Sequence, residues 1–357
     1  MSPKLLLYGA TGFVGVAIAR LAVERGLRPI LGGRNAQRLE PLASSLGLEY
    51  RAFPLDDTTL VDGAFDGISV VLHCAGPFVH TFRPIADACL RRGAHYLDIT
   101  GEIPVYQGLA ELDQEARKRG VMLLPGVGFD VVPTDCLAQY LKRRLPSAKR
   151  LVLAFQVRGP AGLPPGTANT MVEMLPYGVM VCTQGRLAPA PDPGKTRTID
   201  FGTGPVKASL LSWGDIFMAY RSTGIPEIED YAVLPPPVAA LLKTVPYARA
   251  LFANETVQAM LKRLFRMQAG STAEQRARTS THVWGLVEDD EGRSASARLH
   301  GPEAGVVWTE LTALAAVQRV LSGDAPPGFQ TPSLAYGPDF VMSCAGVTRE
   351  DLWLHPD

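Results

Sequence analysis

A glycine-rich turn near the start of the chain constrains the fold more than any other feature. It reads Gly9-Ala10-Thr11-Gly12-Phe13-Val14-Gly15, follows the apolar run 5–8, and opens a helical pattern. Glycine is required where a chain turns sharply, where backbone approaches a pyrophosphate, and where a helix packs closely on a strand. The N–H groups at the helix start would then bind phosphates. The motif predicts a dinucleotide site with contacts from Gly9, Thr11, Gly12, Phe13, Val14 and Gly15.

Short apolar runs alternate with amphipathic helical patterns through the first third of the chain. The strands expected from this alternation are 5–8, 28–31, 50–54, 69–73, 95–99 and 121–124. The expected helices are 13–25, 36–46, 84–92 and 105–119. Strands that alternate with helices across short turns favour right-handed crossovers and a parallel sheet. Residues 1–132 are therefore predicted to form a doubly wound α/β domain of the Rossmann type.

The pattern changes beyond residue 132. A helix at 134–145 precedes consecutive expected strands at 151–157, 196–201, 206–213, 228–233, 281–288 and 294–300. Helical patterns cover 237–252, 255–267, 306–321 and 332–345. Consecutive strands favour an antiparallel or mixed sheet. Residues 133–357 are therefore predicted to form an α+β domain for substrate binding or dimerisation, whose C-terminal helices (about 306–345) pack back toward the first domain.

The segment 159–185 is unusually poor in charge. Glu173 is its only charged residue, in a chain in which 20% of residues are charged. Its four prolines are too frequent for a membrane helix. The favoured interpretation is a buried connection or interface, and the alternative is an apolar substrate wall. The prolines and glycines also hint at a lid.

The composition excludes several classes of function. Lys plus Arg and Asp plus Glu each number 35, so no overall field recruits nucleic acid or anionic lipid. Five cysteines without a CxxC pair favour reduced thiols and a cytoplasmic location, and no signal peptide or 20-residue apolar run is recognisable. The expected partner is a small-molecule, apolar substrate rather than nucleic acid or a membrane span, and a homodimer is compatible with the sequence.

The end of the second expected strand predicts NADP rather than NAD. An NAD site would place a carboxylate on the ribose hydroxyls there, whereas this chain reads Gly32-Gly33-Arg34-Asn35. Arg34 offers a 2′-phosphate a planar cationic fork, and Asn35 or Arg38 could add donors. The alternative is that Arg34 is a solvated surface cation. Asp56, after the third strand, is placed either to accept from the adenine amino group or to cap a helix.

Residues just beyond strands four to six are expected to line the nicotinamide side of the site. The turn Cys74-Ala75-Gly76-Pro77 allows close backbone approach to the cofactor. Asp98, Asp130 and His80 are the predicted proton-handling residues, because burial can raise a carboxyl pKa and histidine titrates near neutrality. Glu102, after the fifth strand, could also transfer a proton. The alternative is that these carboxylates cap helices or accept the N–H groups of turns. No metal motif or GxSxG sequence is present.

Taken together, these motifs resemble the saccharopine dehydrogenase-like oxidoreductase family. The matching pieces are GATGFVG at Gly9, GGRN at Gly32, CAGPF at Cys74, HYLDITGE at His95 and GFDVVPTD at Gly128. The resemblance implies an NADP-binding Rossmann domain, a second α+β domain over the nicotinamide, and hydride transfer. The stretch Gly128 to Asp135 departs from that of saccharopine dehydrogenases proper. The trans-acting enoyl reductases of polyketide lipid assembly, in the same broad family, fit the charge-poor segment better.

The resulting hypothesis is an NADP-dependent oxidoreductase that delivers hydride to a polarised C=C or C=N bond of a largely apolar substrate. A first alternative is an amino-acid imine reductase of the saccharopine type. It would need cationic side chains that hold carboxylates, and Arg83, Arg158 and Arg221 are the candidates. A second alternative is a sensor or scaffold that binds NADP without turnover.

Overall fold

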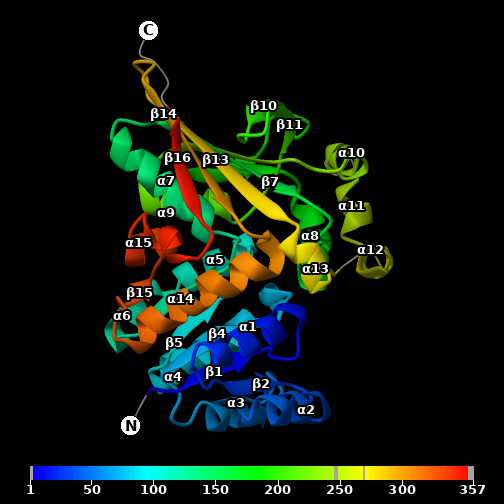
Figure 1. Ribbon diagram of the computed structural model, residues 1–357, viewed down its shortest axis with the longest axis vertical. Helices are drawn as coiled ribbons and strands as arrows, with labels where there is room; N and C mark the ends of the chain where they lie inside the picture. The colour runs from blue at the N-terminus through cyan, green and yellow to red at the C-terminus, as the bar shows by residue number, and fades with distance from the viewer. Residues whose placement is uncertain (1–2, 245–247, 268–269, 353–357) are drawn as a thin grey trace. The chain divides into compact units, whose positions relative to one another are not determined.

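The chain folds as two compact units. The computed structural model describes residues 3–244, 248–267 and 270–352. The first unit comprises Met1–Asp130 and Gly305–Ala335, and the second comprises Val131–Ala304 and Tyr336–Asp357. The chain therefore leaves the first unit after residue 130 and returns to it with helix α14 (Thr309–Leu321), drawn in orange in Figure 1.

The first unit is built on a seven-stranded sheet whose order is β15-β6-β5-β4-β1-β2-β3 and whose pairings are all parallel. Its strands are β1 (Leu5–Tyr8), β2 (Ile30–Gly33), β3 (Tyr50–Ala52), β4 (Val70–His73), β5 (His95–Asp98), β6 (Met122–Leu124) and β15 (Gly328–Phe329). Its helices before residue 130 are α1 (Phe13–Glu24), α2 (Ala36–Leu46), α3 (Thr58–Ala64), the 3-10 helix η1 (Phe78–His80), α4 (Phe82–Arg92), α5 (Ile103–Ala110) and α6 (Asp113–Arg119). This order confirms the predicted doubly wound α/β fold.

The central strands of this sheet are apolar along their whole length because helices cover both faces of a parallel sheet. Every residue of β1 and β4 is buried. Leu6 pairs with Ile30 on one side of β1 and with Val71 on the other. The polar residues of these central strands therefore lie at the strand ends, as His73 does in β4 and Asp98 in β5.

The second unit contains a nine-stranded mixed sheet, which confirms the predicted α+β character. Its main order is β10-β11-β12-β7-β13-β14-β16, with β8 on β12 and β9 on β8. The strands are β7 (Arg150–Arg158), β8 (Met180–Thr183), β9 (Arg186–Pro189), β10 (Thr196–Asp200), β11 (Pro205–Leu210), β12 (Glu227–Ala232), β13 (Ser280–Glu288), β14 (Ser294–Gly301) and β16 (Thr348–Leu352). Only β12 and β7 pair in parallel among these described strands.

Helices of the second unit cover its sheet and extend beyond it. They are α7 (Val132–Arg144), α8 (Pro165–Met174), η2 (Leu175–Tyr177), α9 (Asp215–Thr223), α10 (Pro236–Thr244), α11 (Arg249–Phe252), α12 (Glu255–Met267) and α13 (Ala273–Ala277). Helix α7 packs so closely on β13 that a Cβ at Gly285 would lie 2.7 Å from Leu141 Cδ1. The opposite sheet face is apolar, with Ala154, Phe201 and Tyr231 at its centre.

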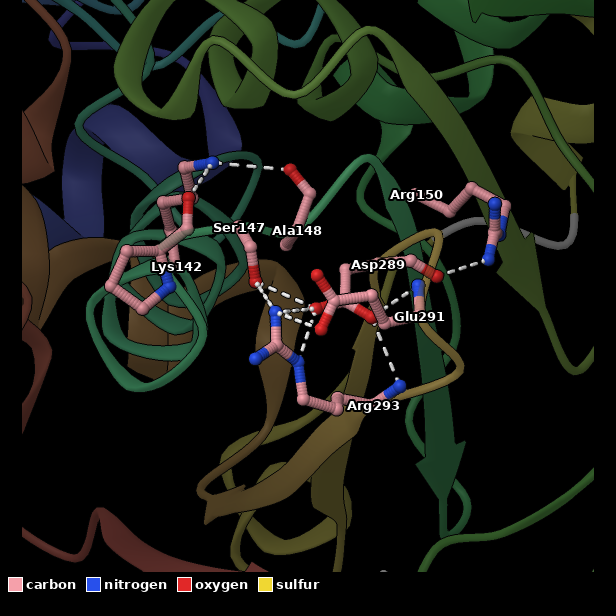
Figure 2. Close-up of polar contacts among 8 residues, drawn as sticks. Lys142, Ser147, Ala148, Arg150, Asp289, Glu291 and Arg293 are labelled. Atoms are coloured by element: carbon pink, nitrogen blue, oxygen red, sulfur yellow. Dashed lines mark hydrogen bonds and ion pairs between the residues drawn. The ribbon is translucent and has the colours of Figure 1, made fainter.

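The hairpin between β13 and β14 is held by a single buried carboxylate, as Figure 2 shows. Asp289 Oδ2 accepts from Ser147 Oγ at 2.7 Å and from Arg293 Nε at 2.7 Å. Asp289 Oδ1 accepts the backbone N–H groups of Glu291 and Arg293. These donors, the Ser147 hydroxyl first, lower the pKa of Asp289 to about 2.

Several predicted elements differ from the structure. The helix expected at 105–119 is two helices, α5 and α6, because α6 has its own N-terminal acids and internal ion pairs, Asp113 with Arg117 and Glu115 with Arg119. The helix expected at 332–345 is broken into α15 (Pro332–Tyr336) and the 3-10 helix η5 (Phe340–Ser343). The chain at 304–308 is a π-helical turn, η4 (Ala304–Trp308), that precedes α14.

The remaining differences concern short or long-range elements. Strands β8, β9, β15 and β16 and helices α8 and α9 were not predicted as separate elements. The helix expected at 237–252 is described as α10 and α11, and residues 245–247 lie outside the described residues. Strand β16 pairs with β14 through Thr348 and His300, almost fifty residues apart, so no local pattern announces it.

Candidate cofactor and active site

The backbone of the glycine loop after β1 lies directly against the backbone of the turn after β4. Gly9 has a φ of +87°, and a Cβ there would lie 2.7 Å from the backbone N of Ala75. Its N–H donates to the carbonyl of Gly32 at 2.9 Å. Gly12 is the N-cap of the twelve-residue helix α1, whose first-turn N–H groups point out of the loop. The space left by the missing side chains and these donors fits a pyrophosphate group.

Two arginines lie beside this loop. Arg34 is exposed at the end of β2, and no carboxylate of the described residues forms an ion pair with it. Arg38, in the first turn of α2, donates from its guanidinium to the carbonyl of Thr11 at 3.1 Å. Asn35 caps α2, since its Oδ1 accepts from the Arg38 backbone N at 3.2 Å. Arg38 thus lies against the glycine loop, and binding of a 2′-phosphate by Arg34 stays a prediction.

Asp56 is exposed, and its neighbour performs the capping role considered for it. Asp57 Oδ1 accepts from the backbone N of Thr59 and of Leu60, at 2.9 and 3.0 Å, at the start of α3. Burial raises the pKa of the Tyr8 hydroxyl to about 12. The charge of Arg34 lowers this pKa, and the charge of Asp56 raises it. Asp56 is thus left for the adenine contact, which stays a prediction.

A buried glutamate shapes the Cys74-Ala75-Gly76-Pro77 turn, which contains a cis peptide bond before Pro77. Glu102 is fully buried, and its two oxygens accept the backbone N–H groups of Phe78 and Val79 at 2.9 and 2.7 Å. The turn therefore has a fixed backbone path before any ligand arrives. Of the two interpretations given for Glu102 from the sequence, proton transfer and acceptance of turn N–H groups, these contacts show the second.

His73, the last residue of β4, is a candidate positioning residue that was not predicted from the sequence. It is fully buried, and burial lowers its pKa to about 3, so its ring is neutral. Its Nδ1 accepts from the Ala75 N–H at 3.4 Å, and its Nε2 lies 2.9 Å from Thr81 Oγ1. The Thr81 hydroxyl in turn donates to the Ala75 carbonyl at 2.8 Å. A histidine at the end of an otherwise apolar strand was the available signal.

Asp98 is fully buried at the end of β5. Its carboxylate accepts from Tyr96 Oη at 2.7 Å, from Thr100 N at 3.0 Å and from Gly126 N at 2.9 Å. Burial raises its pKa to about 7, although these three donors favour the ionised form. The raised pKa is compatible with a role in proton transfer. The three hydrogen bonds and the burial favour a structural role, in which the carboxylate joins the turns after β5 and β6.

The other two predicted proton-handling residues are more accessible. Asp130 is half-buried and follows the loop after β6. His80 is exposed at the end of η1. Both lie in the first unit, like Asp98, and their catalytic roles stay predictions.

The second unit contains a cluster of buried carboxyl groups that sequence reasoning did not bring together. Thr134 and Asp135, from the GFDVVPTD motif, lie at the start of α7, where Thr134 Oγ1 donates to Asp215 Oδ1 of α9. Burial raises the pKa of Asp215 to about 6, while hydrogen bonds from Thr134 and Asp230 lower it. The motif after β6 thus organises the second unit as well as the first.

An apolar cluster lies around Trp213, between β11 and α9. It comprises Leu211, Trp213 and Ala232, with the partly buried Phe155, Met171, Leu234 and Leu242 against them. Met171 comes from the charge-poor segment, which is therefore partly buried as predicted. Among the described residues no acceptor bonds to the indole N–H of Trp213, which is 8% exposed. The cluster therefore combines apolar side chains with one buried hydrogen-bond donor.

Within the described ranges no group of three His, Cys, Asp or Glu residues has the geometry of a metal site. Over the same ranges no helix has the length and apolar character needed to cross a bilayer.

Comparison with known proteins agrees with this geometry. Residues 5–124 match the family model of the saccharopine dehydrogenase NADP binding domain. Trans-acting enoyl reductases of Mycobacterium leprae and Mycobacterium ulcerans are 33% and 31% identical over 149 and 150 residues, in each case 40% of this chain and 36% of the relative. The chain thus matches little more than a third of the length of these curated relatives.

The structure of apo saccharopine dehydrogenase (L-Glu forming) from Saccharomyces cerevisiae has the same overall fold. It aligns with a TM-score of 0.65 over 98% of this chain and 100% of that chain, at 12% identity. The first unit is thus a Rossmann domain of the NADP-binding type. The match to the family model is limited to residues 5–124, and at 12% identity the likeness to the yeast enzyme is one of fold.

Proposed function

We propose that the protein is an NADPH-dependent reductase that delivers hydride to a polarised C=C bond, or a C=N bond, of a largely apolar substrate. The observation that favours an apolar substrate is the charge-poor segment 159–185, whose one charged residue, Glu173, forms an ion pair with Lys262. The names of the mycobacterial relatives favour the enoyl type.

Bound NADPH would supply the hydride, and the residues of this chain would do the rest. The glycine loop binds the pyrophosphate through backbone N–H groups, and Arg34 with Arg38 binds the 2′-phosphate. Glu102 and His73 keep the turn after β4 in one conformation, so the nicotinamide end of the site needs no rearrangement. Asp130 or His80 protonates the carbon that becomes electron-rich as hydride arrives.

An imine reductase for amino acids finds less support from its candidate cations. Arg83 forms an ion pair with Asp87 one helical turn away, at 3.0 Å. Arg158 and Arg221 are both exposed. A substrate that carries several carboxylates needs cations in a partly enclosed site. We therefore favour the apolar substrate.

Cofactor choice is tested by titrating the purified protein with NADPH and with NADH, following nucleotide fluorescence. We expect NADPH to bind at least about tenfold tighter, and Arg34→Ala or Arg38→Ala to remove most of that preference, since each loses a charge-assisted bond to the 2′-phosphate. Arg20→Ala, an exposed arginine on α1, is the matched control. Equal affinity for the two nucleotides would contradict the proposed 2′-phosphate site.

Turnover is tested by NADPH consumption with an enoyl thioester and, separately, with a cyclic imine. Reduction of the thioester supports the proposal, and reduction of the imine alone moves the protein to the imine reductases. NADPH binding without consumption of either substrate would favour the sensor or scaffold. Asp130→Asn and His80→Gln then identify the proton donor, which is the residue whose loss lowers kcat more than KM.

A further inference from the structure

A layer of helices in the second unit, α8, η2, α10, α11 and α12, has its own small apolar centre. Leu175 and Phe252 form that centre, with the partly buried Leu241, Leu242, Ala248 and Leu261 packed against it. An ion pair between Glu173 of α8 and Lys262 of α12 joins two of its helices. Helices α10, α11 and α12 lie together in yellow-green at one side of the second unit (Figure 1). We call this group the helical layer.

The helical layer holds the most exposed large apolar side chains of the described residues. The four most exposed large apolar side chains are Met260, Leu251, Leu264 and Tyr177, at 63%, 56%, 54% and 53% of their full accessibility. All four belong to α11, α12 or η2. Single exposed apolar residues are ordinary, whereas a concentration in one small layer is typical of a binding surface.

Helix α12 has two distinct faces. Val257, Leu261 and Lys262 point toward the rest of the layer and are partly buried. Met260, Arg263 and Leu264 are exposed, and their i, i+3 and i+4 spacing places them on one outer face. That face therefore presents two apolar side chains with a cation between them.

The charge of the layer differs from that of the whole chain. Residues 165–177 and 236–267, which span the layer, carry five basic and two acidic residues, a net charge of +3 in a chain whose net charge is zero. Lys243, Arg249 and Arg263 are exposed, and no carboxylate of the described residues forms an ion pair with them. The neutral overall charge thus conceals a local basic patch, which the composition alone did not reveal.

From these observations we infer that the helical layer docks the protein on an anionic lipid membrane. Exposed apolar side chains beside unpaired cations are what an interfacial helix needs, because the apolar groups enter the acyl boundary while the cations meet the lipid phosphates. An acidic soluble partner would use the cations but would not require side chains as exposed as Met260 and Leu264. The inference does not depend on the proposed reductase activity.

The inference is tested by flotation of the full chain with vesicles of phosphatidylglycerol and phosphatidylcholine in equal parts, and with phosphatidylcholine alone. We expect binding to the anionic vesicles to be at least about tenfold stronger, and to fall as salt is raised. Arg249→Glu with Arg263→Glu should reduce binding about tenfold or more, and Met260→Glu with Leu264→Glu should abolish it.

The matched control is Leu60→Glu, which changes a leucine that is 51% exposed on α3 of the first unit. It should bind vesicles like the unchanged protein. NADPH titration and circular dichroism of each variant verify that both units remain folded.

Absence of binding to anionic vesicles would overturn the inference, as would equal binding by Met260→Glu with Leu264→Glu. If the protein ignores vesicles but is a dimer that these substitutions dissociate, the surface is an interface between copies and the membrane inference is wrong. These outcomes are independent of NADPH turnover, so a failed reductase assay leaves the test intact.

Discussion

The strand ends of the first unit and the helical layer of the second unit are built in opposite ways. At the strand ends, polar side chains are buried and bonded to backbone, as with Glu102 on Phe78 N and Val79 N. In the helical layer, large apolar side chains such as Met260 are exposed. Buried polar groups require fixed geometry, whereas exposed apolar groups require a partner surface. We therefore expect the strand ends to bind a small charged ligand and the helical layer to bind an extended apolar surface.

Gly9→Ala, in the glycine loop of the first unit, is expected to have the largest effect, on NADPH binding. The new Cβ would lie 2.7 Å from the backbone N of Ala75 at a φ of +87°, so the glycine loop and the turn after β4 must separate. We expect NADPH binding to be lost in a fluorescence titration. Gly67→Ala is the control, because Gly67 also has a positive φ, +73°, but a Cβ added there would have no atom within 4 Å. Loss of binding in both variants would show that general destabilisation, rather than close approach, is responsible.

The next effect is expected from Glu102→Gln. The glutamine amide would point its N–H groups at one of the two backbone donors that the carboxylate accepts, so a buried bond becomes a repulsion. We expect a loss of about 1–3 kcal/mol in the free energy of unfolding and weaker NADPH binding. Urea unfolding followed by circular dichroism measures the first and titration the second. The control is Glu111→Gln, at an exposed position, which should change neither quantity. If Glu102→Gln leaves both the free energy of unfolding and the NADPH affinity unchanged, the turn does not depend on the carboxylate.

A third effect concerns the pH dependence of stability. Asp98 has a folded pKa of about 7 against an ordinary value of 3.8, so between these values the folded chain retains a proton that the unfolded chain has lost. The free energy of unfolding therefore falls as pH rises from about 4 to 7. Asp98→Asn removes this contribution and should flatten the profile measured by urea unfolding at several pH values. Asp215→Asn, in the second unit, should flatten it only up to about pH 6. A profile unchanged by Asp98→Asn would contradict the raised pKa.

Asp98→Asn also separates the two roles considered for this residue. The amide oxygen can still accept from Thr100 N and Gly126 N, while its NH2 group can donate to Tyr96 Oη. A positioning role therefore predicts a kcat close to that of the unchanged protein. Catalysis by Asp98 predicts a large loss of kcat at every pH.

The smallest effect is expected far from both regions, at the β13–β14 hairpin. Asp289 has a pKa lowered to about 2, so its stabilising contribution is present above the unfolded value of 3.8 and is lost as pH falls toward 2. Asp289→Asn should lower the Tm at neutral pH and leave NADPH affinity unchanged. Asp290→Asn, at the exposed neighbour, should leave the Tm unchanged. A change in NADPH affinity in Asp289→Asn would show that the hairpin is coupled to the cofactor site.

Much of the first unit was predictable because its signals are local. A parallel strand buried on both faces is a continuous apolar run, and a glycine loop must be glycine, so β1, α1 and α2 were predicted to within about a residue. The second unit was less predictable. Its strands β8, β9 and β16 are four or five residues long, and their pairing partners decide their state.

The candidate site was likewise predictable from the sequence only where the signal is local. Arg34 and the glycines could be proposed from the sequence because spacing from a strand defines their place, and their cofactor contacts stay predictions. The role of Asp57 as the cap of α3, the neutral state of His73 and the meeting of Thr134 with Asp215 were not found. Each of these depends on which groups converge after folding, and residues eighty positions apart leave no joint pattern in a single sequence.

The amino-acid sequence by itself determined the class of fold, the cofactor and the basic side of its binding place. These follow from backbone geometry that only glycine permits and from charge at a fixed distance after a strand. The tertiary structure alone decided protonation and exposure. Burial raises the pKa of Asp98 to about 7, while the fold leaves Met260 exposed to solvent. The environment of a side chain is a property of the folded chain and not of its neighbours in sequence.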